Sequence, residues 1–165
     1  MTSTKNKNKV WKLYFEGENS KEGNGVGVLL VSPEGSLMPF SFKLEFEATN
    51  NIAEYEALLL GLQATKNMNI EFLMVHGDFE LIVKQIQNQC QAKHPRLRTY
   101  WNEVWDLIDN LFLAFNIQFL PREGNIMVDS LAVAARSFDP PQNPLLRCEV
   151  EVRYIPSIPD NVEHW

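Results

Sequence analysis

The stretch TNNIAEYEAL, Thr49 to Leu58, is the part of the sequence that decides the fold. Its two asparagines are residues that favour helix starts, and they predict a helix over residues 50–67. Apolar side chains recur at helical spacing through that range: Tyr55, Leu58, Leu59 and Leu62. Glu54 is an acid set among these apolar positions, and that makes it a candidate functional residue.

Apolar runs on either side of this helix predict the rest of a single domain. We expect strands over residues 10–15, 26–31, 40–46, 73–75 and 115–120, and further helices over residues 79–86, 100–111 and 125–136. This order predicts an α/β domain with a mixed five-stranded sheet, three antiparallel strands first and helices packed on it.

The two ends of the chain differ in composition from this predicted domain. We expect residues 1–9 to form a flexible lead-in, residues 10–136 the domain, and residues 137–165 a tail or linker. Five prolines after Asp139 favour an extended tail outside the core.

Four acidic residues are the candidate catalytic groups. Glu16 and Asp78 follow apolar runs that predict strands, whereas Glu54 and Asp129 fall in helical patterns. Carboxylates gathered from separate elements repel one another unless cations neutralise them, so such a cluster implies bound divalent metal.

Each of these acids also has a simpler interpretation. Glu54 follows Asn51 by three residues and suits a capping box. Asp78 directly precedes a helix and suits an N-cap. Asp129 lies early in its helix, where the helix dipole favours an acid.

The net charge and the composition limit the kinds of partner that we expect this chain to bind. The net charge of −6 gives no overall basic footprint for nucleic acid. Residues 84–98 nevertheless contain no acid and four cations, which are candidate substrate contacts or an ordinary solvated loop: Lys84, Lys93, Arg96 and Arg98. The sequence shows no bilayer-length apolar run and no signal peptide, so we expect a cytoplasmic or nuclear protein without membrane contact.

Three alternating glycines, Gly23, Gly25 and Gly27, raise the question of a phosphate-binding loop. No helical pattern follows them, which excludes a dinucleotide or P-loop motif. We expect residues 17–25 to form a turn between the first two predicted strands, and the three glycines to serve a turn and a closely packed strand.

Taken together, the motifs resemble the ribonuclease H domain of gypsy-class, plant-type LTR-retrotransposon reverse transcriptase polyproteins. The family's Thr-Asn-Asn-x-Ala-Glu-Tyr-x-Ala-Leu stands intact at Thr49 to Leu58. Its Phe-Asp-Gly-Ala and Gly-Asp-Ser appear as Phe15-Glu16-Gly17-Glu18 and Gly77-Asp78-Phe79. Its Pro-Arg-Glu-x-Asn-x-x-Ala-Asp-x-Leu-Ala appears as Pro121 to Ala132, with Val128 in place of Ala.

The resemblance implies hydrolysis of the RNA strand of RNA–DNA hybrids during reverse transcription. The four acids would hold two Mg²⁺ ions, with Mn²⁺ able to substitute, and an attached polymerase domain would supply affinity. Asn50 and Asn51 would contact the RNA strand near the cut, where the 2′-hydroxyl marks RNA.

Departures from the family pattern predict weakened activity. Glu16 replaces Asp, and a displacement of a reacting group by about 1 Å can cost on the order of a hundredfold in rate. Phe79 replaces Ser, and residues 122–125 lack the His of many cellular members. The alternative is an inactive ribonuclease H fold that serves as a structural tether or a nucleic-acid-binding module. Integrase-like or resolvase-like nucleases form a third class, which the intact Thr49 to Leu58 string disfavours.

Overall fold

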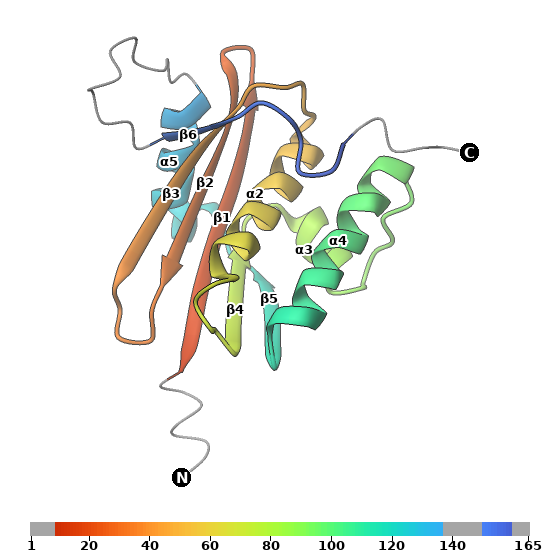
Figure 1. Ribbon diagram of the computed structural model, residues 1–165. Coiled ribbons are helices and arrows are strands. Elements are labelled where there is room, and N and C mark those ends of the chain that lie inside the picture. Colours follow the sequence, from red (N-terminus) through yellow and green to blue (C-terminus); the bar gives the residue numbers. More distant parts are fainter. Residues whose placement is uncertain (1–8, 137–149, 160–165) are drawn as a thin grey trace.

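The computed structural model describes residues 9–136 and 150–159 (Figure 1). Their strands form one mixed sheet in the order β5-β4-β1-β2-β3-β6. The strands are β1 (Val10–Ser20), β2 (Gly23–Val31), β3 (Leu37–Leu44), β4 (Phe72–Gly77), β5 (Ala114–Phe119) and β6 (Val150–Arg153). The helices are α2 (Asn50–Thr65), α3 (Glu80–Ile86), α4 (Pro95–Leu111) and α5 (Ile126–Arg136), with a 3₁₀ turn, η1 (Arg122–Asn125), before α5.

The first three strands are antiparallel neighbours, and β4 and β5 run parallel to β1, which confirms the predicted α/β architecture. Residues 1–8, 137–149 and 160–165 are not described. Most of the expected lead-in and parts of the expected tail therefore lie outside the described residues.

Helices cover both faces of the sheet. In Figure 1, α2, α3 and α4 lie on one side and α5 lies on the other. The predicted apolar face of α2 is confirmed, because Tyr55, Leu58, Leu59 and Leu62 are fully buried. The helix is buried on nearly every side, since it lies between the sheet and α4. A helix enclosed in this way is a rigid support for any side chain that it carries.

Strand β1 is longer than the sequence predicts. We expected a turn from Gly17, whereas the strand continues to Ser20 and pairs with β2 along its whole extension. Gly17 is needed there for its size, because a Cβ at this position would overlap the backbone of Ala53 on α2. The glycine that suggested a turn instead allows helix and strand to touch.

Glycines of β2 allow an equally close contact between strand and helix on the opposite face of the sheet. A Cβ at Gly25 would overlap the carbonyl oxygen of Ala132, and one at Gly27 would overlap that of Val128. Both carbonyls belong to α5, so the predicted close packing of this strand is confirmed. The helix can then lie almost directly on β1 and β2.

The segment after residue 149 joins the fold. Strand β6 pairs in parallel with β3, so the sheet has a sixth strand beyond the five predicted. The chain then crosses to α2 and α4. There Ser157 donates hydrogen bonds from its backbone N–H and its hydroxyl to Glu56, over 2.8 and 2.6 Å. The proline content of the tail gave no indication of this strand or of this contact.

Candidate active site

The sheet topology creates an open edge where β4 ends. Its last pair with β1 joins Gly77 to Phe15, whereas β1 continues for five more residues. The side chains of Glu16 and of Asp78, the residue after β4, therefore meet at this point. Ligand sites in α/β sheets commonly lie at the carboxyl ends of parallel strands.

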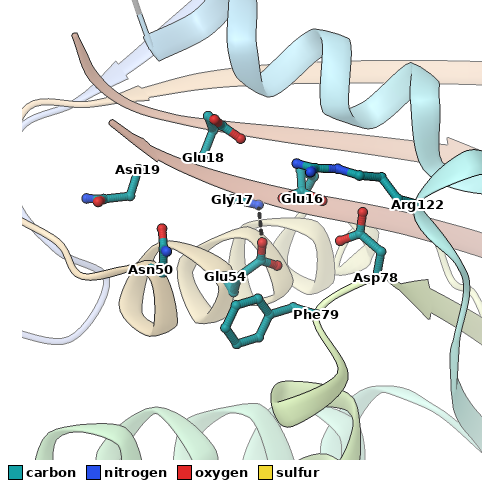
Figure 2. A pocket seen from close by; sticks show the side chains of 9 residues that line it. All are labelled: Glu16, Gly17, Glu18, Asn19, Asn50, Glu54, Asp78, Phe79 and Arg122. Carbon is teal, nitrogen blue, oxygen red and sulfur yellow. Dashed lines mark hydrogen bonds between the residues drawn. The ribbon is translucent and has the colours of Figure 1, made fainter. Parts of the chain in front are cut away.

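Three of the four predicted acids form a tight group at that edge. Glu16, Glu54 and Asp78 each offer a carboxylate oxygen within 4.8 Å of the other two (Figure 2). Glu16 and Glu54 are only 3% and 2% exposed. The structure thus brings β1, α2 and the end of β4 together at one acidic point.

Neither Glu54 nor Asp78 acts as a helix cap. The N-cap of α2 is Thr49, whose hydroxyl accepts from Ile52 N, whereas Glu54 Oε1 accepts the N–H of Gly17 at 3.1 Å. The N-cap of α3 is Phe79, with no side-chain cap bond. The simpler capping interpretations therefore fail at both positions.

Asp129 joins a second group that also contains Glu16. Glu16, Glu18 and Asp129 place carboxylate oxygens within 4.8 Å of one another. Asp129 reaches β1 because α5 packs closely on the strands, and the amide of Asn125 fixes the start of α5 by donating to the carbonyl of Phe15. The other three predicted acids therefore surround Glu16.

The acids of the first group carry buried oxygens that lack hydrogen-bond partners. Glu16 Oε2, Glu54 Oε2 and Asp78 Oδ2 are buried and have no hydrogen-bond partner. Buried polar atoms are nearly always paired, so orphan oxygens on three neighbouring acids call for a ligand. A cluster of carboxylate oxygens with no His or Cys suits a hard divalent cation such as Mg²⁺. These residues fit the metal that the fold implies.

The electrostatics agree with this assignment. Burial, together with the neighbouring Asp78 and Glu54, raises the pKa of Glu16 to about 11. Burial also raises the pKa of Glu54 to about 8, against the lowering effect of its contacts with Glu16 and the Gly17 N–H. Without cations, therefore, the site favours protonated carboxyls over a set of buried negative charges.

The first acidic group lines a pocket of about 310 Å³, whose wall also includes Glu18, Asn50, Phe79 and Arg122 (Figure 2). Liquid water occupies about 30 Å³ per molecule, so the pocket has room for hydrated cations and a phosphate group. Asn50 is exposed at its rim, and Asn51, the next residue, is half-buried in the first turn of α2.

None of the four residues predicted as basic substrate contacts lines this pocket, and their surroundings differ from one another. Lys84 pairs with Glu80 at 2.8 Å, and Lys93 is exposed at the turn before α4. The guanidinium of Arg98 lies over the ring of Trp101. Arg96 donates to the carbonyls of Ile158 and Pro159, so the C-terminal segment engages part of this strip.

Two residues of the site escaped the sequence analysis. Glu18 appears there only as the last residue of Phe15-Glu16-Gly17-Glu18, and Arg122 only within the loop of residues 122–125 that lacks His. Arg122 lies 3.4 Å from Asp129, which is the largest cause of its raised pKa. The two-residue spacing of Glu16 and Glu18 would have placed both on one face of a strand, had the strand been predicted past Phe15.

Known proteins are similar to this chain in sequence and in fold. Residues 14–135 match the model of the family described as reverse transcriptase-like. The chain belongs to that family. It is 32% identical over 123 residues to ribonuclease HI of Halobacterium salinarum, and the match covers 72% of this chain and 60% of that protein. The chain thus spans less than two thirds of this curated relative.

Solved structures of ribonuclease H1 proteins are also similar to this chain. The crystal structure of RNase H1 from Halobacterium salinarum matches with a TM-score of 0.71 and 29% identity, over 76% of this chain and 96% of that one. LC11-RNase H1 in complex with an RNA/DNA hybrid matches with a TM-score of 0.66 and 26% identity, over 76% and 96%. Residues 14–135 thus contain a ribonuclease H-like domain, as the motifs indicated. In the described part of the chain, no helix is long and apolar enough to cross a membrane.

Proposed function

We propose that this domain hydrolyses the RNA strand of RNA–DNA hybrids in a reaction that depends on divalent metal. The observation that carries the proposal is the group of three acids with buried, unpartnered oxygens beside a fourth acid. Similarity to LC11-RNase H1, which was solved with an RNA/DNA hybrid, supports the substrate class.

Glu16 is the central residue of the proposed site, because it belongs to both acidic groups. Glu54 and Asp78 would hold one cation with it, and Asp129 would hold a second cation on its other side. When bound, two divalent cations supply the positive charge that activates water for attack and stabilises the leaving oxygen of a phosphodiester.

The protein's own residues set the geometry of this reaction. The Gly17 N–H holds Glu54 Oε1 in place, which leaves Oε2 for a ligand. Asn50 at the rim and Asn51 beside it would contact the RNA strand. Lys84, Lys93, Arg96 and Arg98 would contact phosphates further along the hybrid.

The biological setting that we propose is reverse transcription by a gypsy-class LTR retrotransposon. The reverse transcriptase-like family and the motifs of the sequence support this setting. An attached polymerase domain would then add affinity for the hybrid, which the acidic net charge of this chain does not provide.

The test is cleavage of a labelled RNA–DNA hybrid with Mg²⁺ and then Mn²⁺. We expect weak cleavage by the wild type, an increase in Glu16→Asp and none in Asp78→Asn. Asp106→Asn is a matched control, because it removes an acid from an exposed position on α4. Cleavage that persists in Asp78→Asn would show a contaminating nuclease and remove the support for the proposal.

One observation favours the alternative of an inactive, binding domain. The ring of Phe79 lines the pocket beside Asp78, where the family has a small Ser (Figure 2). If folded wild type and Glu16→Asp both fail to cleave with either metal, while hybrid binding persists, the tethering or binding function takes precedence.

A further inference from the structure

Glu18 stands in the second acidic group although it lies outside the four acids of the family motif. It is two residues from Glu16 on the same strand, so both side chains project from one face of β1 (Figure 2). Their partners across the sheet are Gly27 and Gly25, which carry no side chains. The face around the two glutamates is therefore open to α5, and α5 brings Asp129 to them.

The buried Glu16 points to a ligand in this group as well as in the first. Its side chain is 3% exposed and its Oε2 has no hydrogen-bond partner. When all three carboxyls are ionised, Glu18 and Asp129 cannot satisfy that atom, because ionised carboxylates are acceptors only. A cation among them would satisfy all three.

The contacts of the other two acids leave each of them one oxygen for such a cation. Glu18 Oε1 accepts from the guanidinium of Arg136 at 2.5 Å, and Asp129 Oδ1 lies 3.4 Å from Arg122. These arginines hold the two carboxylates in position. Within the described residues, no hydrogen bond engages Glu18 Oε2 or Asp129 Oδ2.

We propose that Glu18 is a fifth carboxylate ligand, which completes a divalent cation site with Glu16 and Asp129. This inference deepens the proposed function, because it adds a ligand to one of the two metal positions. An additional charged oxygen raises the affinity of a site for a hard cation. It also offsets the altered reach of Glu16, since the cation gains a contact that does not depend on that side chain.

Metal binding without nucleic acid tests the proposal. Mn²⁺ titration of the full chain, followed by the EPR signal of free Mn²⁺, gives the affinity and number of sites for wild type and Glu18→Gln. We expect one site to weaken about tenfold in Glu18→Gln, as is usual for loss of a group that supports a metal site. The amide of Gln keeps an acceptor for Arg136, which protects the fold.

Glu22→Gln is the matched control. Glu22 also faces Arg136, at 3.8 Å, and its removal changes the net charge equally, but its side chain is 68% exposed and lies outside the acidic groups. We expect less than about a twofold change in this variant, as for an exposed, screened charge. Equal effects of the two substitutions, or no effect of Glu18→Gln, would overturn the proposal.

The same titration separates this inference from the proposed function. Asp78→Asn should weaken the other site and leave the Glu18 site, because Asp78 belongs only to the first acidic group. If no variant cleaves a hybrid but Glu18→Gln still binds Mn²⁺ more weakly than Glu22→Gln, Glu18 remains a ligand and only the nuclease function fails. Should Glu18→Gln be unfolded by circular dichroism, Glu18→Asp, which keeps the charge, replaces it with the same expected selective weakening.

Discussion

Glu54 and Glu56 are two residues apart on α2 and equally buried, yet they have opposite surroundings. Glu56 Oε1 accepts from the Tyr100 hydroxyl at 2.6 Å, and both its oxygens accept from Ser157. Glu54 Oε2 has no hydrogen-bond partner. The comparison teaches that burial alone does not identify a functional acid. An acid whose oxygens all accept hydrogen bonds supports the fold. An acid that keeps an unpartnered oxygen beside other carboxylates is available to bind a ligand.

The largest expected effect concerns Glu54→Gln. Hybrid cleavage should fall by at least about a hundredfold, because a neutral amide is a poor ligand for a hard cation. In chelator, the free energy of unfolding should not fall, since one of several repelling carboxylates has gone. Single-turnover cleavage and urea unfolding measure the two quantities. A loss of stability without loss of cleavage would give Glu54 the role that we assign to Glu56.

Glu56→Ala should show the reverse pattern. Loss of this carboxylate removes the acceptor of the Tyr100 hydroxyl and of both Ser157 donors, which should lower the free energy of unfolding by about 3 kcal/mol. The loss should be the same in Mg²⁺ and in chelator. Urea titration in both media is the measurement, and a loss confined to Mg²⁺ would show that Glu56 takes part in metal binding.

The pH dependence of stability sharpens the comparison further. Burial raises the pKa values of Glu16 and Glu54 above the value of 4.5 expected for the unfolded chain. The folded protein then keeps protons that the unfolded chain releases, so the contribution of these two groups to stability in chelator is greatest below pH 4.5. It should fall as the pH rises through about 8, the pKa of Glu54, by up to about 1.4 kcal/mol per pH unit for each retained proton.

Urea midpoints between pH 5 and 8 measure this slope. Glu16→Gln should reduce it in chelator, because one of the two proton-retaining carboxyls is gone. Saturating Mg²⁺ should reverse the trend in the wild type, since only deprotonated carboxylates bind the ion. A wild-type slope unchanged by Mg²⁺ would contradict a metal site at these acids.

The smallest expected effect is that of Ser157→Ala. The hydroxyl bond to Glu56 Oε2 is lost, whereas the backbone N–H of residue 157 still donates to Oε1. We expect a loss of about 1 kcal/mol, typical of one hydrogen bond. Thermal or urea unfolding detects it, with hybrid cleavage unchanged. A loss as large as that of Glu56→Ala would mean that the hydroxyl alone anchors the segment.

The sequence was sufficient to predict the order of the elements in residues 10–136 and the four acids that gather at the site, Glu16 among them. Helical spacing in α2 and alternation in the strands report burial directly, so those elements were predictable. The gathering of the acids came from the resemblance of several motifs, since no single acid distinguishes a ligand from a cap.

What the sequence did not reveal depends on contacts between distant segments. Gly17 suggested a turn because its close approach to Ala53 is visible only in three dimensions. The end of β1, and with it Glu18, was missed for that reason. The parallel pairing of β6 with β3 was missed as well, because a four-residue strand at a sheet edge has no distinctive local pattern.

The docking of the C-terminal segment has a consequence for how the protein is made. Glu56 and Ser157 are 101 residues apart in the chain, and β6 comes after every other strand. During synthesis, α2 emerges from the ribosome long before the residues that complete the hydrogen bonds of Glu56. These contacts therefore form only after residue 157 has been synthesised, and until β6 is made the edge of β3 is open to pairing with other proteins.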